Sequence, residues 1–159
     1  MLFVTLVLLL AAVDLGLKWL IERQEAETFP RPLEHTNKKI MLYQNHNAGF
    51  PFGFLEKYGE LVRVFPLVVI SALGGVLGYL IPRRGHIGEK LGLAVILGGA
   101  LSNLYDRYVR RYVVDYFSVQ IGALKKVVFN LGDIFVFLGT GILLFLEIWT
   151  EIREKFHNR

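Results

Sequence analysis

Long apolar runs dominate the chain, and four of them are long enough to form membrane-spanning helices. A helix needs about 20 mainly apolar residues to cross roughly 30 Å of hydrocarbon. The third and fourth runs are short, and they reach a spanning length only when their polar flanks belong to the helices. The predicted spans are about 2–21, 61–81, 89–107 and 130–150.

The segments between the spans contain short strand-like patterns. Loops 22–60 and 108–129 lie on one side of the membrane, because two spans separate them, and the even number of spans places both termini on the other side. Apolar and aromatic residues at 40–44 and at 113–121 predict strands in these two loops. The sequence therefore predicts one polytopic membrane domain over 1–159, with a small sheet on the side of the membrane that holds loops 22–60 and 108–129.

Composition agrees with a membrane protein and argues against several other classes. A chain that is 53% apolar, with a mean hydropathy of +0.44, would leave large apolar patches on a soluble domain of this size. The absence of cysteine excludes thiol nucleophiles and thiolate metal sites. Histidines are scattered without a zinc-peptidase motif. Basic residues are spread among apolar segments, which favours membrane lipids over nucleic acid as a partner.

Two patterns leave alternatives open. The two long loops hold more Lys and Arg than the short loop and the C-terminal tail, but the short loop is denser in charge, so the basic residues do not decide the orientation. The Gly74–Gly78 stretch contains a GxxxG spacing, which lets helices approach closely. Packing inside the bundle is the preferred explanation of this spacing, and dimerisation is the alternative.

The first span contains ionisable residues whose presence needs an explanation, because placing ionisable groups in hydrocarbon costs free energy. Asp14 and Lys18 are four residues apart and share one helix face, with the acid on the N-terminal side. They either neutralise each other or fix a site or a lipid headgroup. The turn-rich stretch 45–53 is either a surface turn or a source of backbone donors for an extended peptide.

Acidic and amide residues gather at one end of the third and fourth spans. Asn103 and Asp106 close the third span, Asp115 follows in the loop, and Asn130 and Asp133 open the fourth. The loop turns back, so the carboxylates of Asp115 and Asp133 can face each other at one depth, as an aspartyl hydrolase requires. Two simpler explanations compete. Asp133 and Asn130 can cap a helix, and Asp106 can pair with Arg107 or Arg110.

Paired carboxylates would give this cluster acid and base chemistry. Two carboxylates held close together share a proton, because both cannot ionise cheaply. The ionised member can take a proton from an attacking water while the protonated member donates to the carbonyl oxygen. A proton or ion carrier is a further hypothesis, but the acidic groups of the third and fourth spans lie at one end only, which disfavours a path through the bilayer.

These residues together resemble the lipoprotein signal peptidase family, the type II signal peptidases of bacteria, over nearly the whole chain. Five motifs occur in the family's order. They are Asp14-x-x-x-Lys18, Asn47-Ala48-Gly49 with Phe52-Gly53, Asn103-Leu104-Tyr105-Asp106-Arg107, Val113-Val114-Asp115-Tyr116 and Phe129-Asn130-Leu131-Gly132-Asp133.

The resemblance implies an α-helical integral membrane protein with four transmembrane helices and a small extracytoplasmic β-sheet. It implies an aspartic endopeptidase that removes the signal peptide from prolipoproteins bearing a diacylglyceryl-modified cysteine, with no cofactor and no metal. Asp115 and Asp133 would be catalytic. The residues expected to support the site or bind substrate are Asn47, Gly49, Asn103, Asp106, Arg107, Asn130, Asp14 and Lys18.

The resemblance also implies a location. The protein would be a monomer that crosses the bacterial cytoplasmic (inner) membrane several times, with the active site at the extracytoplasmic face and both termini in the cytoplasm. That orientation runs against the raw count of basic residues.

Several positions depart from the family pattern close to the expected chemistry. Phe50-Pro51 replaces Ala-Ala, Ser102 replaces Gly, Arg111 stands where Gly is usual, and Gly132 replaces Ala. Bulk at Phe50 and the fixed backbone angle of Pro51 can reshape a substrate cleft. The alternative function is therefore a divergent, non-catalytic paralogue that binds lipidated peptides.

Overall fold

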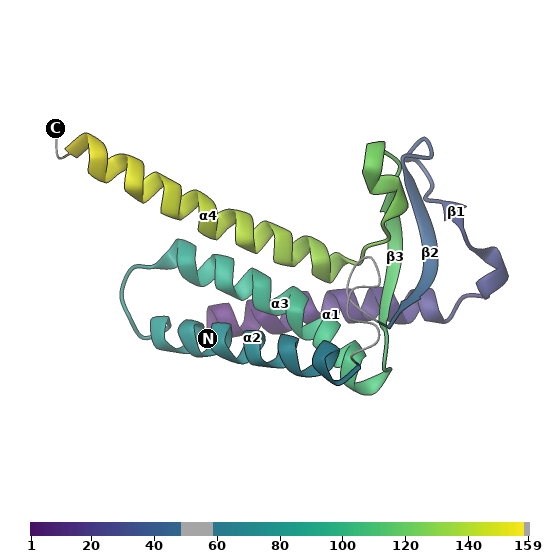
Figure 1. The fold of residues 1–159 in the computed structure, drawn as a ribbon, viewed down its shortest axis with the longest axis horizontal. Helices are drawn as coiled ribbons and strands as arrows, with labels where there is room; N and C mark the ends of the chain where they lie inside the picture. Colours follow the sequence, from purple (N-terminus) through teal and green to yellow (C-terminus); the bar gives the residue numbers. More distant parts are fainter. Residues whose placement is uncertain (49–58, 158–159) are drawn as a thin grey trace.

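The computed structural model describes residues 1–48 and 59–157, which form long helices with a small sheet across one end (Figure 1). Three of the helices begin and end within two residues of the predicted spans, whereas α4 continues beyond the predicted end at 150. The helices are α1 Leu2–Glu22, α2 Gly59–Leu80, α3 Ile87–Val109 and α4 Leu131–His157.

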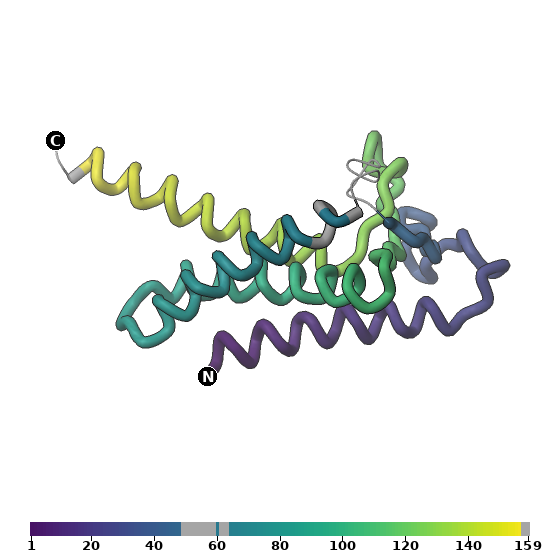
Figure 2. The backbone as a smooth tube through the Cα atoms, turned by 60° about the horizontal axis from the view of Figure 1, so that its bottom comes forward, coloured from purple at the N-terminus to yellow at the C-terminus, as the bar shows by residue number. Residues whose placement is uncertain are grey.

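The helices run side by side, with both termini at the end opposite the sheet (Figures 1 and 2). Within the described residues, α1, α3 and α4 are long and apolar enough to cross a membrane. The apolar part of α2, Val64–Leu80, is shorter. The fold is therefore the helical membrane fold with a small sheet that the sequence predicts.

Helix α3 lies at the centre of the bundle, in contact with α1, α2 and α4. Over its apolar window 56% of α3 is buried, against 28% for α1 and 11% for α4. A helix surrounded by other helices can carry polar side chains that lipid would reject. Ser102, Asn103 and Asp106 on α3 are indeed buried, which places them inside the protein.

Glycines set the close approach of α3 and α4. Gly92 lies against Gly139, and one helical heptad further along α3 Gly99 lies against Gly132. A Cβ built on Gly139 would stand 2.6 Å from the carbonyl oxygen of Gly92, closer than real Cβ atoms stand to their neighbours. Small residues of this kind let helix backbones touch in a membrane. The second contact brings the start of α4 against the polar end of α3.

The Gly74–Gly78 spacing does not serve this purpose. A Cβ on Gly74, Gly75 or Gly78 would meet no described heavy atom within 4 Å outside its own helix backbone. These glycines therefore do not bring two described helices into close contact, so the preferred explanation, packing inside the bundle, is wrong for this stretch.

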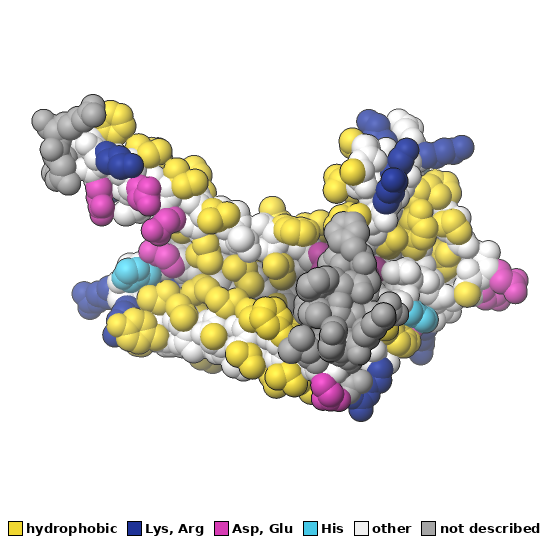
Figure 3. Space-filling view, in the orientation of Figure 1, with side chains coloured by type: hydrophobic (Ala, Val, Ile, Leu, Met, Phe, Trp, Pro, Cys, Tyr) yellow, Lys and Arg dark blue, Asp and Glu magenta, His cyan; other side chains and the backbone are white. Residues whose placement is uncertain are grey.

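The sheet is antiparallel, in the order β1-β2-β3. Strand β2, Ile40–Asn47, and β3, Val113–Val119, confirm the predicted strands, while the two-residue β1, Arg31–Pro32, was not predicted. Buried Ile21, Val114 and Tyr116 join the end of α1 to β3 in one apolar cluster. Short 3-10 helices, η1 at Ala26–Thr28 and η3 at Gly122–Lys126, flank the strands. On the face shown in Figure 3, hydrophobic side chains cover much of the helices, and Lys and Arg gather at the sheet end and at the turn before α3.

We expect Gly139→Ala to lower stability in detergent by about 1–3 kcal/mol, because the added methyl forces α4 away from α3. Gly141→Ala is the matched control on the same helix, where an added Cβ meets no described atom within 4 Å. There the change should be neutral or stabilising by about 0.5–1 kcal/mol, since alanine favours a helix over glycine. Equal thermal unfolding midpoints for the two variants would contradict the contact.

Candidate active site

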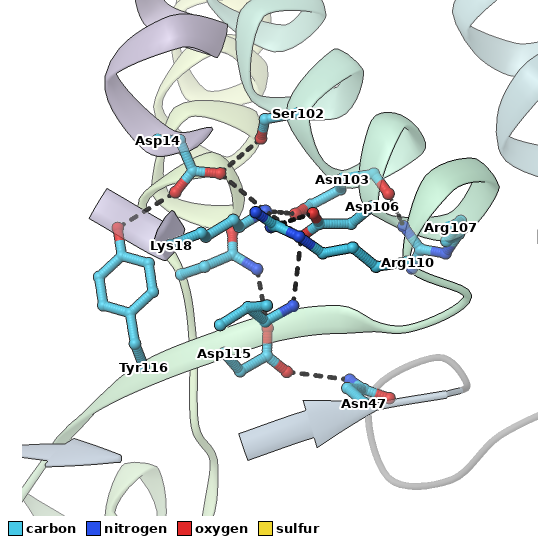
Figure 4. Close-up of polar contacts among 12 residues, drawn as sticks. Asp14, Lys18, Asn47, Ser102, Asn103, Asp106, Arg107, Arg110, Asp115 and Tyr116 are labelled. Carbon is cyan, nitrogen blue, oxygen red and sulfur yellow. Dashed lines mark hydrogen bonds and ion pairs between the residues drawn. The ribbon is translucent and has the colours of Figure 1, made fainter. Parts of the chain in front are cut away.

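A fully buried lysine lies at the centre of the polar cluster (Figure 4). The ammonium of Lys18 is 2.9 Å from Oδ2 of Asp14 and 3.0 Å from Oδ2 of Asp106, and it donates to Oδ1 of Asn103 at 2.7 Å. The neutralising pair is therefore present, and it does not exclude the second alternative, a role in the site. The two groups neutralise each other, and the same lysine reaches a residue of the expected site.

Asn103 connects Lys18 to Asp133 through its side-chain amide. Because Lys18 donates to the amide oxygen of Asn103, the amide nitrogen is left to donate, and it bonds Oδ1 of Asp133 at 2.9 Å. The lysine thus fixes which way the amide points. Asn103 lies on α3 and Asp133 on α4, next to the Gly99–Gly132 contact, so the glycine packing brings the two side chains within reach.

Asn130 joins the two acidic residues. Its amide nitrogen donates to Oδ1 of Asp115 at 2.7 Å, and its backbone N–H donates to Oδ2 of Asp133 at 3.1 Å. The N–H of Asp133 donates back to Oδ1 of Asn130 at 3.0 Å, which completes a reciprocal cap at the start of α4. The capping explanation is therefore correct, and it coexists with the paired carboxylates.

The sheet supplies the remaining contact of Asp115. Asn45 pairs with Asp115 across β2 and β3, and Asn47 pairs with Val113, so Asn47 is the diagonal neighbour of Asp115 on the same face. Its amide donates to Oδ2 of Asp115 at 3.0 Å. Burial, and next the charge of Asp133, raise the pKa of Asp115 from 3.8 to about 6.

This arrangement suits a shared proton. Each carboxylate of the pair accepts two of the hydrogen bonds described above, one on each oxygen, which holds both groups in place and leaves acceptor capacity for a water. A carboxyl that titrates near neutral pH beside a second carboxylate can exchange protons with a reacting water and carbonyl.

Asp106 and the arginines that follow it close the end of α3. Asp106 pairs with Arg110 at 2.6 Å, as one of the simpler explanations proposed, and its Oδ2 accepts the N–H of Val114 at 3.2 Å. Arg107 donates to the backbone oxygen of Asn103 at 3.2 Å, and its charge lies near Asp133, Asp115 and Asp106. Arg111 adopts φ of 74°, a left-handed conformation that favours glycine.

Two polar contacts were not predicted from the sequence. Ser102, which departs from the family pattern, donates to Oδ2 of Asp14 at 2.5 Å. Tyr116 donates to Oδ1 of Asp14 at 3.1 Å, and burial raises the pKa of Tyr116, which keeps its hydroxyl protonated. The sequence gives no sign of these two contacts, because the hydroxyls and the carboxylate are far apart along the chain and meet only in the folded protein.

Gly49, expected to support the site, lies outside the described residues, as does the Phe50-Pro51 departure. Within residues 1–48 and 59–157, no group of three or more His, Asp or Glu side chains is arranged to hold a metal ion.

Comparison of the sequence with known proteins finds one family and many relatives. The sequence model of the family described as signal peptidase (SPase) II matches residues 6–149. The lipoprotein signal peptidase of Clostridioides difficile is 31% identical over 159 residues, covering 98% of this chain and 100% of that protein. The lipoprotein signal peptidase of Mesorhizobium japonicum is 34% identical over 119 residues, covering 72% and 68% of the two chains.

Solved structures agree with the fold. Two structures described as bacterial membrane enzymes, determined by the in meso method at 2.3 and 1.9 Å resolution, superimpose with TM-scores of 0.75 and 0.71. Each is 17% identical in sequence. The first covers 92% of this chain and 87% of its own, and the second 91% and 90%.

The raised pKa of Asp115 makes a prediction about stability. Since folding raises this pKa from 3.8 to about 6, the stability that Asp115 contributes is present at low pH and is lost as the pH rises through about 6. Asp115→Asn removes the carboxyl whose ionisation causes this loss of stability. The unfolding midpoint of this variant minus that of the unchanged protein should therefore be larger at about pH 7.5 than at about pH 5.

The matched control is Glu147→Gln, which removes an exposed carboxylate from α4. Thermal unfolding in detergent at both pH values measures each difference. A difference for Asp115→Asn that stays constant between the two pH values, like that expected for the control, would contradict the raised pKa.

Proposed function

The chain belongs to the signal peptidase II family, and on this basis we propose that it removes signal peptides from prolipoproteins with Asp115 and Asp133 as its catalytic pair. It is an enzyme of the aspartic endopeptidase type and a multi-pass bacterial membrane protein. The observation that carries the proposal is Asn130, which bonds the carboxylates of both aspartates at once.

The pair would work by general acid and base catalysis. Of the two carboxylates, one is ionised and one protonated. A water between them gives a proton to the ionised member as its oxygen attacks the peptide carbonyl, while the protonated member donates to the carbonyl oxygen. When the C–N bond breaks, the leaving amine takes a proton from the protonated aspartate, while a hydroxyl of the tetrahedral intermediate gives its proton to the ionised one, so the pair again holds one proton. The proton belongs to the pair as a whole, so neither aspartate is assigned a fixed role.

The amide side chains around the pair support this chemistry by holding it still. Asn47, Asn103 and Asn130 each donate to one carboxylate, and none of them can change its charge. Arg107 places a positive charge near both aspartates, which offsets part of the negative charge that develops during the attack. Positioning of this kind lowers the barrier without reorganisation during the reaction.

We further propose that the substrate carries a diacylglyceryl-modified cysteine just after the scissile bond. The pair lies where the helices meet the sheet, so acyl chains anchored beside the helices would hold the peptide at the depth of the carboxylates. The active site then faces the extracytoplasmic side and both termini face the cytoplasm. The placement of both termini at the end opposite the sheet supports this arrangement (Figure 1).

The rival function is a non-catalytic protein that binds lipidated peptides with the same groups. No contact in the described cluster favours it, and both carboxylates expected for catalysis are present. Turnover separates the two functions, because a binding protein has none to lose.

A cleavage assay on the purified protein tests the proposal. We expect cleavage of a diacylglyceryl-modified prolipoprotein and none of its unmodified form. Asp115→Asn, Asp133→Asn and the double variant should each lower turnover by at least about 1,000-fold and by similar amounts, because the pair acts as a unit. Binding of the lipidated substrate should remain in all three.

Glu147→Gln is the control, since it removes an exposed acid from the same helix as Asp133. Its turnover should match that of the unchanged protein. Retained cleavage in either aspartate variant would refute the catalytic pair, and binding without any cleavage by the unchanged protein would support the rival function.

A further inference from the structure

The buried carboxylate of Asp14 is held by more than its lysine. Its Oδ2 lies 2.9 Å from Nζ of Lys18 and accepts the hydroxyl of Ser102 at 2.5 Å, while its Oδ1 accepts the hydroxyl of Tyr116 at 3.1 Å. Asp14, Lys18 and Ser102 are fully buried, and Tyr116 is 6% exposed. Both oxygens of Asp14 are therefore fixed by protein donors from α1, α3 and β3.

The hydroxyl of Tyr116 makes a second contact that reaches the start of α4. It accepts the backbone N–H of Leu131 at 3.0 Å. This N–H is one of the donors that a helix leaves unpaired at its first turn. A single oxygen atom thus connects β3, α1 and the first residue of α4 (Figure 4 shows its contact with Asp14).

The position of Tyr116 along the chain gives this connection its importance. Tyr116 directly follows Asp115 in β3, and Leu131 lies two residues before Asp133 in α4. The hydroxyl contact therefore ties the strand that carries one carboxylate to the helix turn that carries the other. The contact therefore influences the distance between Asp115 and Asp133, although the hydroxyl bonds neither carboxylate.

A second route leads from the same hydroxyl to Asp133. Tyr116 holds Asp14, Asp14 pairs with Lys18, Lys18 orients Asn103, and Asn103 donates to Asp133. The first three links are buried and the last is partly buried, and in a region of low dielectric constant such polar contacts keep a narrow geometry. The first route therefore ends at the helix turn that carries Asp133, and the second ends on the carboxylate of Asp133 itself.

We propose that Tyr116 is a positioning residue of the aspartate pair, whose hydroxyl holds the first turn of α4 and Asp14 so that Asp133 stays in register with Asp115. This inference rests on the proposed function of the pair. The ring of Tyr116 packs with Ile21 and Val114 in the apolar cluster, so the ring and the hydroxyl can be tested separately.

Tyr116→Phe is the test, because it removes only the hydroxyl and keeps the ring. We expect kcat for the lipidated prolipoprotein to fall on the order of 10- to 100-fold, since small displacements of catalytic groups cost that much. KM should stay within about twofold, because substrate contacts are unchanged. Hydrogen–deuterium exchange of the amides at the start of α4 should become faster, since the N–H of Leu131 loses its acceptor.

Tyr112→Phe is the matched control. Its hydroxyl also lies next to β3 and also donates to an acid at the end of α1, Glu22, at 3.1 Å, but it makes no described contact with α4. We expect its kcat, KM and exchange at the start of α4 to match those of the unchanged protein within about twofold.

Several results would overturn the inference. They are an unchanged kcat in Tyr116→Phe, an equal fall in Tyr112→Phe, a change in KM alone, or a Tyr116→Phe protein that no longer folds. If the unchanged protein cleaves nothing, the proposed function fails instead, and exchange at the start of α4 still decides whether the hydroxyl holds that turn.

Discussion

The site depends on the burial of one positive charge. Lys18 has no exposed surface, so its ammonium must find its partners inside the protein or destabilise the fold. It finds Asp14 on its own helix, with Asp106 and Asn103 on α3. This requirement fixes how α1 and α3 face each other. It also fixes the amide of Asn103, which in turn holds Asp133.

Residues at the site serve the fold and the proposed chemistry together. Asn130 and Asp133 cap α4, and the same two side chains face Asp115 and Asn103. Asp106 pairs with Arg110 and also accepts the N–H of Val114 at the start of β3. The simpler explanations considered for these residues were therefore not rivals of a site. A carboxylate that caps a helix is held in one place, which is what an acid or base requires.

The sequence predicts the helices and the two longer strands that the structure contains, because apolar length and strand pattern are local properties. The aspartate pair comes from the order of the motifs and stays a prediction. The sequence misses what depends on the register between elements. The spacing at Gly74–Gly78 suggested internal packing, but the helix contacts that matter use other glycines of α3 and α4. Likewise, Ser102 and Tyr116 gain their partner only because the fold brings Asp14 against them. The glycines in contact are Gly92, Gly99, Gly132 and Gly139.

The most direct test of this account compares two buried lysines of the bundle. Lys18→Met keeps the length of the side chain and removes the charge, and it should abolish cleavage while lowering stability by about 3–5 kcal/mol, because buried Asp14 loses its ion-pair partner and buried Asp106 keeps only Arg110. Lys90→Met removes a lysine that bonds only the carbonyl oxygens of Arg83 and Gly85 among the described contacts, at the other end of α3, and cleavage should persist. Full cleavage by Lys18→Met would contradict the central place given to this charge.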